Sequence, residues 1–174
     1  MKIYFIKTDN NAEKLSSVLF PLIYKRETKE NIDIPYQQIK RNQYGKPLPI
    51  RGIYYNISHT EKMWCIVFCD SQCGIDIEKS KDIDERIKRR ILSKNEKIIG
   101  GNILNNWVIK EAYSKYLGLG LNIDFRDIST NDIIGHENAT NLSTNDYVCF
   151  VVSKKPSDIK VAYLKEEDLV KTGC

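Results

Sequence analysis

The chain has 174 residues, of which 41% are apolar and 29% charged, so it can bury one sizeable core or two small subdomains packed together. Its net charge of +4 suits an acidic partner or a phosphorylated ligand, but the excess is too small to indicate a nucleic-acid partner. No apolar run approaches the length of a transmembrane helix, and the apolar run in residues 1–7 is too short for a signal-peptide core. We therefore expect a cytoplasmic protein with no membrane partner and no nucleic-acid partner.

Strands and one helix are expected at the start of the chain. Ile, Tyr and Phe predict a strand at residues 2–6, and apolar residues recurring every three or four positions predict a helix at 12–26. Residues 32–43 are polar and need no regular element. A turn is expected at 44–47, and a short strand at 54–60 leads into a polar turn.

Two carboxylates lie in a predicted strand near the middle of the chain. An apolar strand at 63–69 and a second strand at 75–78 are separated by a turn, which predicts a hairpin. Because side chains alternate along a strand, Asp76 and Glu78 share one face, while the isoleucines of this strand face a core. Neighbouring carboxylates repel each other and resist burial, and a hard divalent cation such as Mg²⁺ between them removes both penalties. The alternative is a solvated edge strand that carries two acids, and this stretch alone leaves both open.

Helices are expected after the acidic strand. One begins with acidic residues and covers about 82–91, and a capping-box pattern at 93–96 predicts the start of another. A third helix is expected at 104–117, before a glycine of the kind that ends helices. The last third of the chain predicts apolar strands at 147–152 and 159–164.

The third helix carries a second group of polar residues. Trp107, Glu111 and Lys115 are spaced four residues apart and therefore share one face, and Lys110 lies beside Glu111. A Glu–Lys pair at this spacing is also typical of an exposed salt bridge worth about 0.3 kcal/mol. That alternative does not explain why the same face carries a tryptophan.

Cysteine usage argues against both a disulfide framework and a zinc site. The five cysteines are Cys65, Cys69, Cys73, Cys149 and Cys174. An odd number is not typical of a secreted disulfide-bonded protein. The chain also lacks the Cys-x-x-Cys pairs of zinc sites and has only two histidines. We therefore expect buried free thiols, apart from an exposed Cys174 at the end of a polar tail.

Four stretches of the chain occur in an order and spacing typical of one family. They are Gly45-Lys46-Pro47, Asn56-Ile57-Ser58-His59, Gly74-Ile75-Asp76-Ile77-Glu78 and Trp107-Val108-Ile109-Lys110-Glu111-Ala112-Tyr113-Ser114-Lys115. Together they resemble the 4′-phosphopantetheinyl transferase superfamily, specifically the kind that activates peptide synthetases such as surfactin synthetase. Each pattern is modest alone, but all of them in order in one chain are specific, and they cover about residues 44–121.

The resemblance implies an enzyme that uses coenzyme A as co-substrate. It would transfer the 4′-phosphopantetheine arm of coenzyme A to a serine of an acyl or peptidyl carrier protein and release adenosine 3′,5′-bisphosphate. Mg²⁺ is the implied cofactor, held by Asp76, Glu78 and Glu111. Glu111, directly or through a water molecule, would be the catalytic base for the carrier serine, and Lys115 would contact a phosphate oxygen or lie near the leaving group.

Further side chains are implied at coenzyme A. Lys46, Ser58 and His59 would hold its 3′-phosphate or nucleotide end. Lys110 would bind phosphate or simply be solvated, and the two are equally open. The part of the chain before Gly45 is shorter than in relatives of this kind, which usually carry a basic segment that contacts the nucleotide. Its candidate substitutes are Lys14, Lys25, Arg26 and Lys40.

The fold implied by the resemblance is α+β. Two similar subdomains, residues 1–82 and 83–174, would be related by pseudo-twofold symmetry, each with a small antiparallel sheet and packed helices. Coenzyme A would bind in the cleft between them. A monomer is expected, because the family includes single-chain pseudo-dimers.

Two alternatives from other classes stay open. A degenerate family member would bind a carrier protein or coenzyme A without turnover; the short first part favours this, and the intact set of acids with Lys115 argues against it. A weak nucleic-acid binder is favoured only by the net positive charge and ten tyrosines. No stripe of interleaved arginine and aromatic residues supports that alternative.

Overall fold

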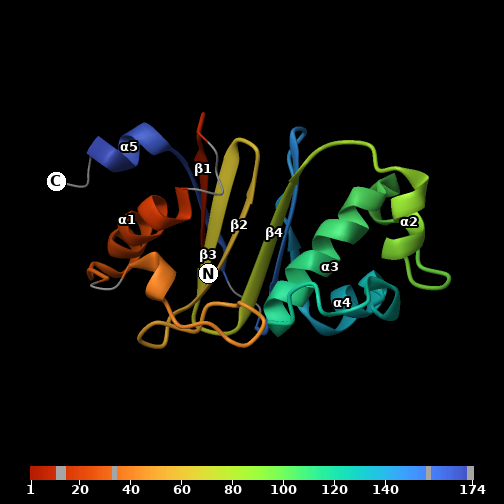
Figure 1. Ribbon diagram of the computed structural model, residues 1–174. Coiled ribbons are helices and arrows are strands. Elements are labelled where there is room, and N and C mark those ends of the chain that lie inside the picture. The colour runs from red at the N-terminus through yellow and green to blue at the C-terminus, as the bar shows by residue number, and fades with distance from the viewer. Residues whose placement is uncertain (11–14, 33–34, 156–157, 172–174) are drawn as a thin grey trace.

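The computed structural model describes residues 1–10, 15–32, 35–155 and 158–171. Within these residues, seven strands form two sheets whose outer faces are covered by helices (Figure 1). The strands are β1 (Lys2–Lys7), β2 (Tyr54–Thr60), β3 (Met63–Cys69), β4 (Cys73–Lys79), β5 (Asn138–Asn141), β6 (Tyr147–Ser153) and β7 (Lys160–Lys165). The α-helices are α1 (Ser16–Thr28), α2 (Glu85–Ile91), α3 (Ile103–Leu117), α4 (Thr130–His136) and α5 (Glu166–Lys171). Short 3₁₀ turns are η2 (Tyr36–Gln38), η3 (Ile99–Gly101) and η4 (Phe125–Asp127).

The first sheet has the strand order β2-β3-β1-β7, and helices α1 and α5 cover its outer face (Figure 1). Its strands are antiparallel except for β1 and β7, which run parallel from Lys2↔Lys160 to Lys7↔Lys165. The expectation of a purely antiparallel sheet is therefore wrong here. Parallel pairing is available because β7 comes from the far end of the chain, which provides the long connection that parallel strands need.

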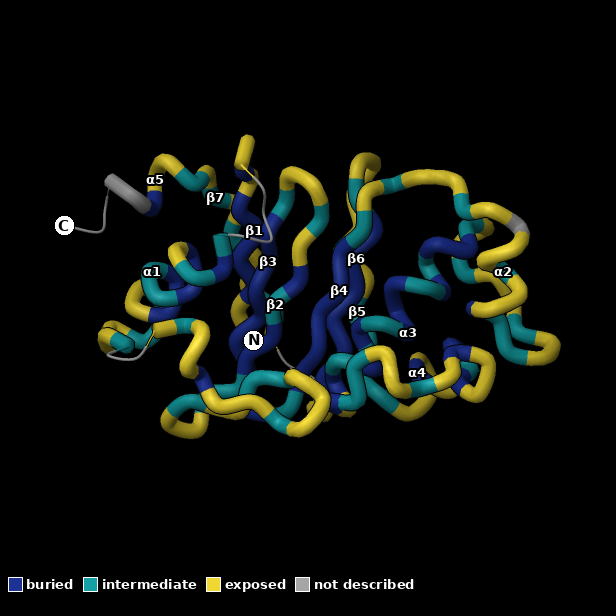
Figure 2. The backbone as a smooth tube through the Cα atoms, viewed as in Figure 1, coloured by how far each residue is buried: buried dark blue, intermediate teal, exposed yellow. Residues whose placement is uncertain are grey.

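The second sheet has the order β4-β6-β5 and is antiparallel, and α3 packs on its outer face. Between the two sheets lies a shared apolar layer, which Figure 2 shows as buried strands in the middle of the molecule. This layer includes Ile3, Phe5, Cys65, Val67, Ile75, Ile77, Cys149 and Val151. The isoleucines of β4 face this layer, as their alternation predicts, so Asp76 and Glu78 face the opposite way, toward α3.

The α+β fold class is confirmed, with several local corrections. Strands β3 and β4 do not form the predicted hairpin; they follow each other in the chain but pair in different sheets. The helix predicted to begin at residues 93–96 does not form there. The backbone N–H of Ser93 does donate to the carboxylate of Glu96 at 2.7 Å, as in a capping box. Helix α3 ends at Gly118 (φ 77°), as predicted.

Sheet pairing crosses the expected division between residues 82 and 83 in both directions. Strand β4, from the first part, pairs in the second sheet, and β7, from the second part, pairs in the first. The pseudo-twofold relation and the division itself stay predictions. Residues 12–14 of the first predicted helix lie outside the described part of the chain.

Two further expectations concern thiols and membranes. Cys65, Cys69, Cys73 and Cys149 are buried and free, as predicted, and Cys174 lies outside the described residues. Among the residues that the structure describes, no helix is both long and apolar enough to cross a bilayer.

Candidate active site

Strand β4 and helix α3 bring three carboxylates together. Oxygen atoms of Asp76, Glu78 and Glu111 lie within 4.8 Å of one another. This close approach depends on Gly74, because a Cβ atom there would lie 2.2 Å from the carbonyl oxygen of Ala112 in α3. The glycine of the Gly-Ile-Asp-Ile-Glu stretch therefore lets α3 pack directly on β4 and places Glu111 beside the acids of the strand.

Asp76 is held by two donors on one oxygen only. Its Oδ1 accepts hydrogen bonds from Ser58 Oγ at 2.8 Å and from Lys115 Nζ at 2.6 Å, and Lys115 Nζ also donates to Ser58 Oγ at 2.9 Å. The residue is 2% exposed, and its Oδ2 is buried without a hydrogen-bond partner in the described part of the chain. Leaving a buried acceptor unsatisfied typically costs about 1–3 kcal/mol, so this oxygen is suited to coordinate a cation.

The electrostatics of the cluster favour the binding of a cation. Burial first, and then the negative charge of Asp76, raise the pKa of Glu111 to about 8. The same two causes raise the pKa of Glu78. Burial opposes the charged form of Lys115, but the charge of Asp76 and the hydrogen bond to it outweigh burial and raise the pKa of this lysine. A single lysine thus leaves the three carboxylates incompletely neutralised.

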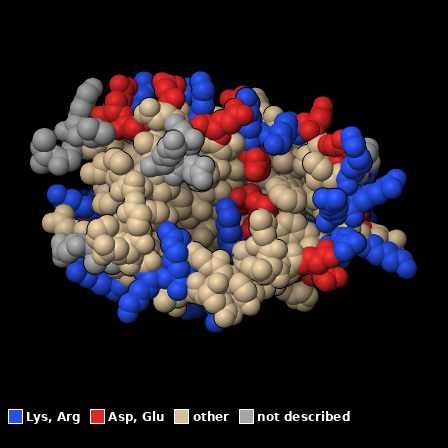
Figure 3. Space-filling view, in the orientation of Figure 1, with Lys and Arg blue, Asp and Glu red and all other residues tan. Residues whose placement is uncertain are grey.

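The three carboxylates fit a hard divalent cation. They offer oxygen ligands from two elements, one of these oxygens lacks any other partner, and a nearby positive charge would lower the raised pKa values. Figure 3 shows acidic side chains in the middle of this face of the molecule, with basic side chains next to them, where the two sheets meet.

The junction between β2 and β4 is made by side chains rather than by a backbone ladder. Asn56 Oδ1 accepts the backbone N–H of Ile75 at 2.9 Å, two residues before Ser58 contacts Asp76. Both side chains are buried, and they alternate along β2 with Tyr55 and Ile57, which pack in the apolar core on the other face of the sheet. Sequence reasoning placed Ser58 at coenzyme A, whereas the structure shows it bound to Asp76 and Lys115. It assigned no role to Asn56, although the asparagine is part of the motif.

Lys46 binds backbone carbonyl groups on the other side of this junction. Its Nζ donates to the carbonyl oxygens of Cys73 at 3.0 Å and Tyr116 at 2.7 Å, and burial lowers its pKa to about 8. Asn42 holds the same turn on α3, donating to the carbonyl oxygen of Gly118 at 2.7 Å. The ammonium of Lys46 therefore joins the turn to β4 and α3, and the coenzyme A contact expected of it stays a prediction, since Lys46 also lines the pocket described next.

A pocket of about 240 Å³ lies between the turn, the end of β2 and the end of α3. Side chains with polar or charged groups in its wall include Tyr36, Arg41, Tyr44, Lys46, His59 and Lys115. Lys115 belongs both to this wall and to the carboxylate cluster, so the two are contiguous. Its volume is below the about 300–1,000 Å³ of sites that enclose a drug-sized ligand, so the pocket suits one end of a larger ligand.

Lys110 is not at this site, which corrects the expectation that it binds coenzyme A or is solvated. Its side chain is fully buried, and Nζ donates to Glu96 Oε2 at 2.5 Å and to the carbonyl oxygens of Ile91 at 2.6 Å and Phe125 at 2.8 Å. Three acceptors around Nζ match the three donors of an ammonium group. Trp107 packs edge-on against Phe125, with ring centroids 5.2 Å apart, and is likewise part of the core.

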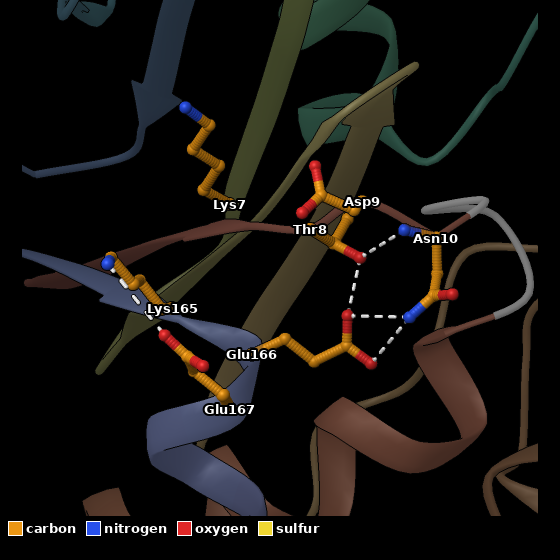
Figure 4. Close-up of a pocket in the computed structure, with 7 residues that line it drawn as sticks. All are labelled: Lys7, Thr8, Asp9, Asn10, Lys165, Glu166 and Glu167. Atoms are coloured by element: carbon orange, nitrogen blue, oxygen red, sulfur yellow. Dashed lines mark hydrogen bonds and ion pairs between the residues drawn. The ribbon is translucent and has the colours of Figure 1, made fainter.

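A larger pocket lies away from all of these residues. It has a volume of about 620 Å³ and is lined by Lys7, Thr8, Asp9, Asn10, Lys165, Glu166 and Glu167 (Figure 4). Glu166 accepts hydrogen bonds there from Thr8 Oγ1 at 2.5 Å and Asn10 Nδ2 at 3.1 Å. Its polar groups largely bind one another, and none of the predicted site residues lines it.

The fold and the site together define an α+β protein with a three-carboxylate cluster beside a pocket for one end of a ligand. The model of the 4′-phosphopantetheinyl transferase superfamily matches residues 72–164, and the chain belongs to this superfamily. It is 30% identical over 130 residues to the 4′-phosphopantetheinyl transferase gsp of Aneurinibacillus migulanus, a match that covers 68% of this chain and 55% of gsp. It is also 30% identical over 138 residues to the 4′-phosphopantetheinyl transferase Sfp of Bacillus subtilis (strain 168), covering 72% and 60%. The chain thus matches a little over half the length of these relatives.

Proposed function

We propose that this protein transfers the 4′-phosphopantetheine arm of coenzyme A to a serine of an acyl or peptidyl carrier protein in a Mg²⁺-dependent reaction. The observation that carries the proposal is the cluster of Asp76, Glu78 and Glu111, with an unpartnered buried oxygen, contiguous with a pocket through Lys115. Membership of the superfamily, and two relatives named as 4′-phosphopantetheinyl transferases, support the same reaction.

The residues of the cluster have distinct roles in this proposal. Asp76, Glu78 and Glu111 hold Mg²⁺, which when bound supplies positive charge to the pyrophosphate of coenzyme A. Lys115, kept charged by Asp76, contacts a phosphate oxygen and helps to orient the pyrophosphate. Ser58 fixes the positions of Asp76 and Lys115 by contacting both side chains.

Bond making requires a base and a leaving group. The carrier serine hydroxyl attacks the β-phosphorus of coenzyme A, its proton passes to Glu111 directly or through a water molecule, and the pyrophosphate bond breaks to release adenosine 3′,5′-bisphosphate. Bound Mg²⁺ would lower the raised pKa of Glu111, so that its carboxylate would be ionised and able to accept this proton. The nucleotide end of coenzyme A occupies the pocket beside Lys115, with His59 in its exposed wall.

The test is a transfer assay on apo carrier proteins. The protein is incubated with an apo carrier, coenzyme A and MgCl₂, and the carrier is weighed by mass spectrometry. The expected result is a carrier heavier by one phosphopantetheine, only when Mg²⁺ is present. Asp76→Ala should abolish the gain with an unchanged circular dichroism spectrum, whereas Asp132→Ala, the same change at an exposed position on α4, should not.

The same assay separates transfer from binding without turnover. If several apo carriers gain no mass, the transferase proposal is wrong. Mg²⁺-dependent binding of coenzyme A in the absence of any mass gain would then identify the chain as a degenerate member of the family.

A further inference from the structure

Among the described residues, the wall of the pocket beside the carboxylate cluster has four potentially cationic side chains, and two of them, Lys115 and Lys46, bind groups of the protein itself. Lys115 Nζ pairs with Asp76 at 2.6 Å. Lys46 Nζ donates to two backbone carbonyl groups, and burial lowers its pKa to about 8. A second phosphate group, placed in the pocket away from Lys115, therefore needs another cation. The other two cationic side chains of the wall are His59 and Arg41, and of these residue types only arginine is charged throughout the neutral pH range.

Two contacts position the side chain of Arg41. Its guanidinium carbon lies 5.2 Å from the centroid of the Tyr36 ring, and Nη1 donates to the carbonyl oxygen of Gly45 at 3.0 Å. In the part of the chain that the structure describes, Arg41 pairs with no acidic side chain and uses one of its five N–H donors for a hydrogen bond. Its remaining donors are therefore available at the wall of the pocket.

A planar guanidinium with free donors recognises a phosphomonoester better than a lysine does, because it can form two parallel hydrogen bonds to the dianion. The ring of Tyr44 also lines this pocket, which suits a flat base. A nucleotide that carries a second, terminal phosphate matches this combination of an aromatic wall and a positioned arginine.

We propose that Arg41, positioned by Tyr36 and by the Gly45 carbonyl group, binds the 3′-phosphate of coenzyme A and makes the enzyme select coenzyme A over 3′-dephospho-coenzyme A. This proposal rests on the proposed function. It assigns the nucleotide end to a residue that sequence reasoning passed over. Of the substitutes considered there, Lys25, Arg26 and Lys40 do not line the pocket, and Lys14 lies outside the described residues.

The test compares the two coenzymes with the wild type and three variants. Arg41→Gln should lower kcat/KM for coenzyme A by about 10- to 100-fold, the effect expected for losing a charged hydrogen-bond partner. It should leave kcat/KM for 3′-dephospho-coenzyme A unchanged. Tyr36→Leu should lower the preference for coenzyme A by a smaller factor, because it removes only the ordering of the guanidinium. Lys40→Gln makes the same change of charge one residue away and outside the pocket, so it should change neither value.

The proposal would be overturned if Arg41→Gln lowered kcat/KM by the same factor with both coenzymes. It would also be overturned if Arg41→Gln changed kcat/KM with neither coenzyme. If the wild type transfers from neither coenzyme, the proposed function fails, and the assignment of Arg41 is still decided by calorimetry. Wild type should then bind adenosine 3′,5′-bisphosphate more tightly than adenosine 5′-monophosphate, and Arg41→Gln should lose that difference. Equal affinities in wild type, or no detectable binding of the bisphosphate, would overturn the assignment.

Discussion

Replacing Lys110 by methionine tests whether this lysine stabilises the fold or binds a ligand. The substitution keeps an unbranched side chain of similar length but removes a charge that contacts Glu96 and two backbone carbonyl groups. Removing one partner of a buried ion pair typically costs about 3–5 kcal/mol.

The pKa of Glu96 gives a second measure of how much the hydrogen bonds around this buried pair stabilise the fold. Burial alone would raise the pKa of Glu96, but hydrogen bonds from Lys110, Thr130 and Ser93 outweigh it and lower the pKa from 4.5 to about 2. Such a shift corresponds to about 3 kcal/mol of stability, shared among these hydrogen bonds, of which the one from Lys110 is the largest. Because the pKa of the folded state lies below that of the unfolded chain, this stability is present at neutral pH and is lost as the pH falls from about 4.5 toward 2.

Urea unfolding followed by circular dichroism measures the effect. We expect Lys110→Met to lower the free energy of unfolding at pH 7 by about 3 kcal/mol, with a melting temperature about 6–12 °C lower. It should also flatten the pH dependence below pH 4.5, and it should leave the dissociation constant of coenzyme A unchanged. The exposed control Lys94→Met should unfold like the wild type.

A double variant checks that the pair is the cause. Lys110→Met combined with Glu96→Gln should be less destabilised than the sum of the two single variants, because no uncompensated charge remains buried. If Lys110→Met keeps its stability and loses affinity for coenzyme A, the structural assignment of this lysine is refuted.

Three further changes probe the site itself. In the metal-free protein the pKa of Glu111 is raised from 4.5 to about 8, so its favourable contribution is complete below about pH 4.5 and declines as the pH rises toward 8. Glu111→Gln should remove that decline in the free energy of unfolding, which urea titrations between pH 5 and 8 measure. It should also abolish the rise in melting temperature that MgCl₂ gives the wild type. If MgCl₂ still raises the melting temperature of the variant by the same amount, Glu111 is not a Mg²⁺ ligand. Calorimetric Mg²⁺ titrations at pH 7 in buffers of different ionisation enthalpy should show release of about one proton by the wild type and none by Glu111→Gln. Gly74→Ala should cost about 1–3 kcal/mol or more, because its Cβ would meet the backbone of α3, and an unchanged urea midpoint would contradict the close packing. Asn56→Ala should lower stability by about 1–3 kcal/mol by leaving the N–H of Ile75 buried without its acceptor, which the same unfolding curves measure.

The local periodicities of the sequence predict the elements that carry the cluster. Alternation along β4 places Asp76 and Glu78 on one face, and four-residue spacing on α3 places Glu111 and Lys115 on another. These rules depend only on the geometry of one strand and one helix. They do not say with which strand β4 pairs, and so the predicted hairpin with β3 is wrong.

The two lysines of α3, Lys110 and Lys115, lie on different faces of the helix. Asn106, Lys110 and Ser114 are also four residues apart, and all three are buried, which makes a second polar stripe that faces the protein interior. This spacing is visible in the sequence, and it separates Lys110 from the face of Glu111. Glu96 is the partner of Lys110 in the interior, and the sequence marks this glutamate only as part of a capping box.

The contacts of Lys46 were beyond prediction from sequence for a different reason. Its acceptors are the backbone carbonyl groups of Cys73 and Tyr116, and every residue carries such a group. No pattern of side chains could mark these two positions. Arg41 is similar, because its orientation depends on a tyrosine ring and on a carbonyl group in the turn that follows it.

The pairing of β7 beside β1 has a consequence for the order of events during synthesis. The partner of Lys2 is Lys160, so the edge of the first sheet cannot close until the residues of β7 have left the ribosome. Contacts so distant along the chain slow folding, because a long loop must close before they can form. Until then β1 can pair only with β3, and its other edge stays open to other strands. We therefore expect nascent chains that stop before residue 160 to be recognised by chaperones, and the cluster of Asp76, Glu78 and Glu111 to form before the sheet next to it is complete.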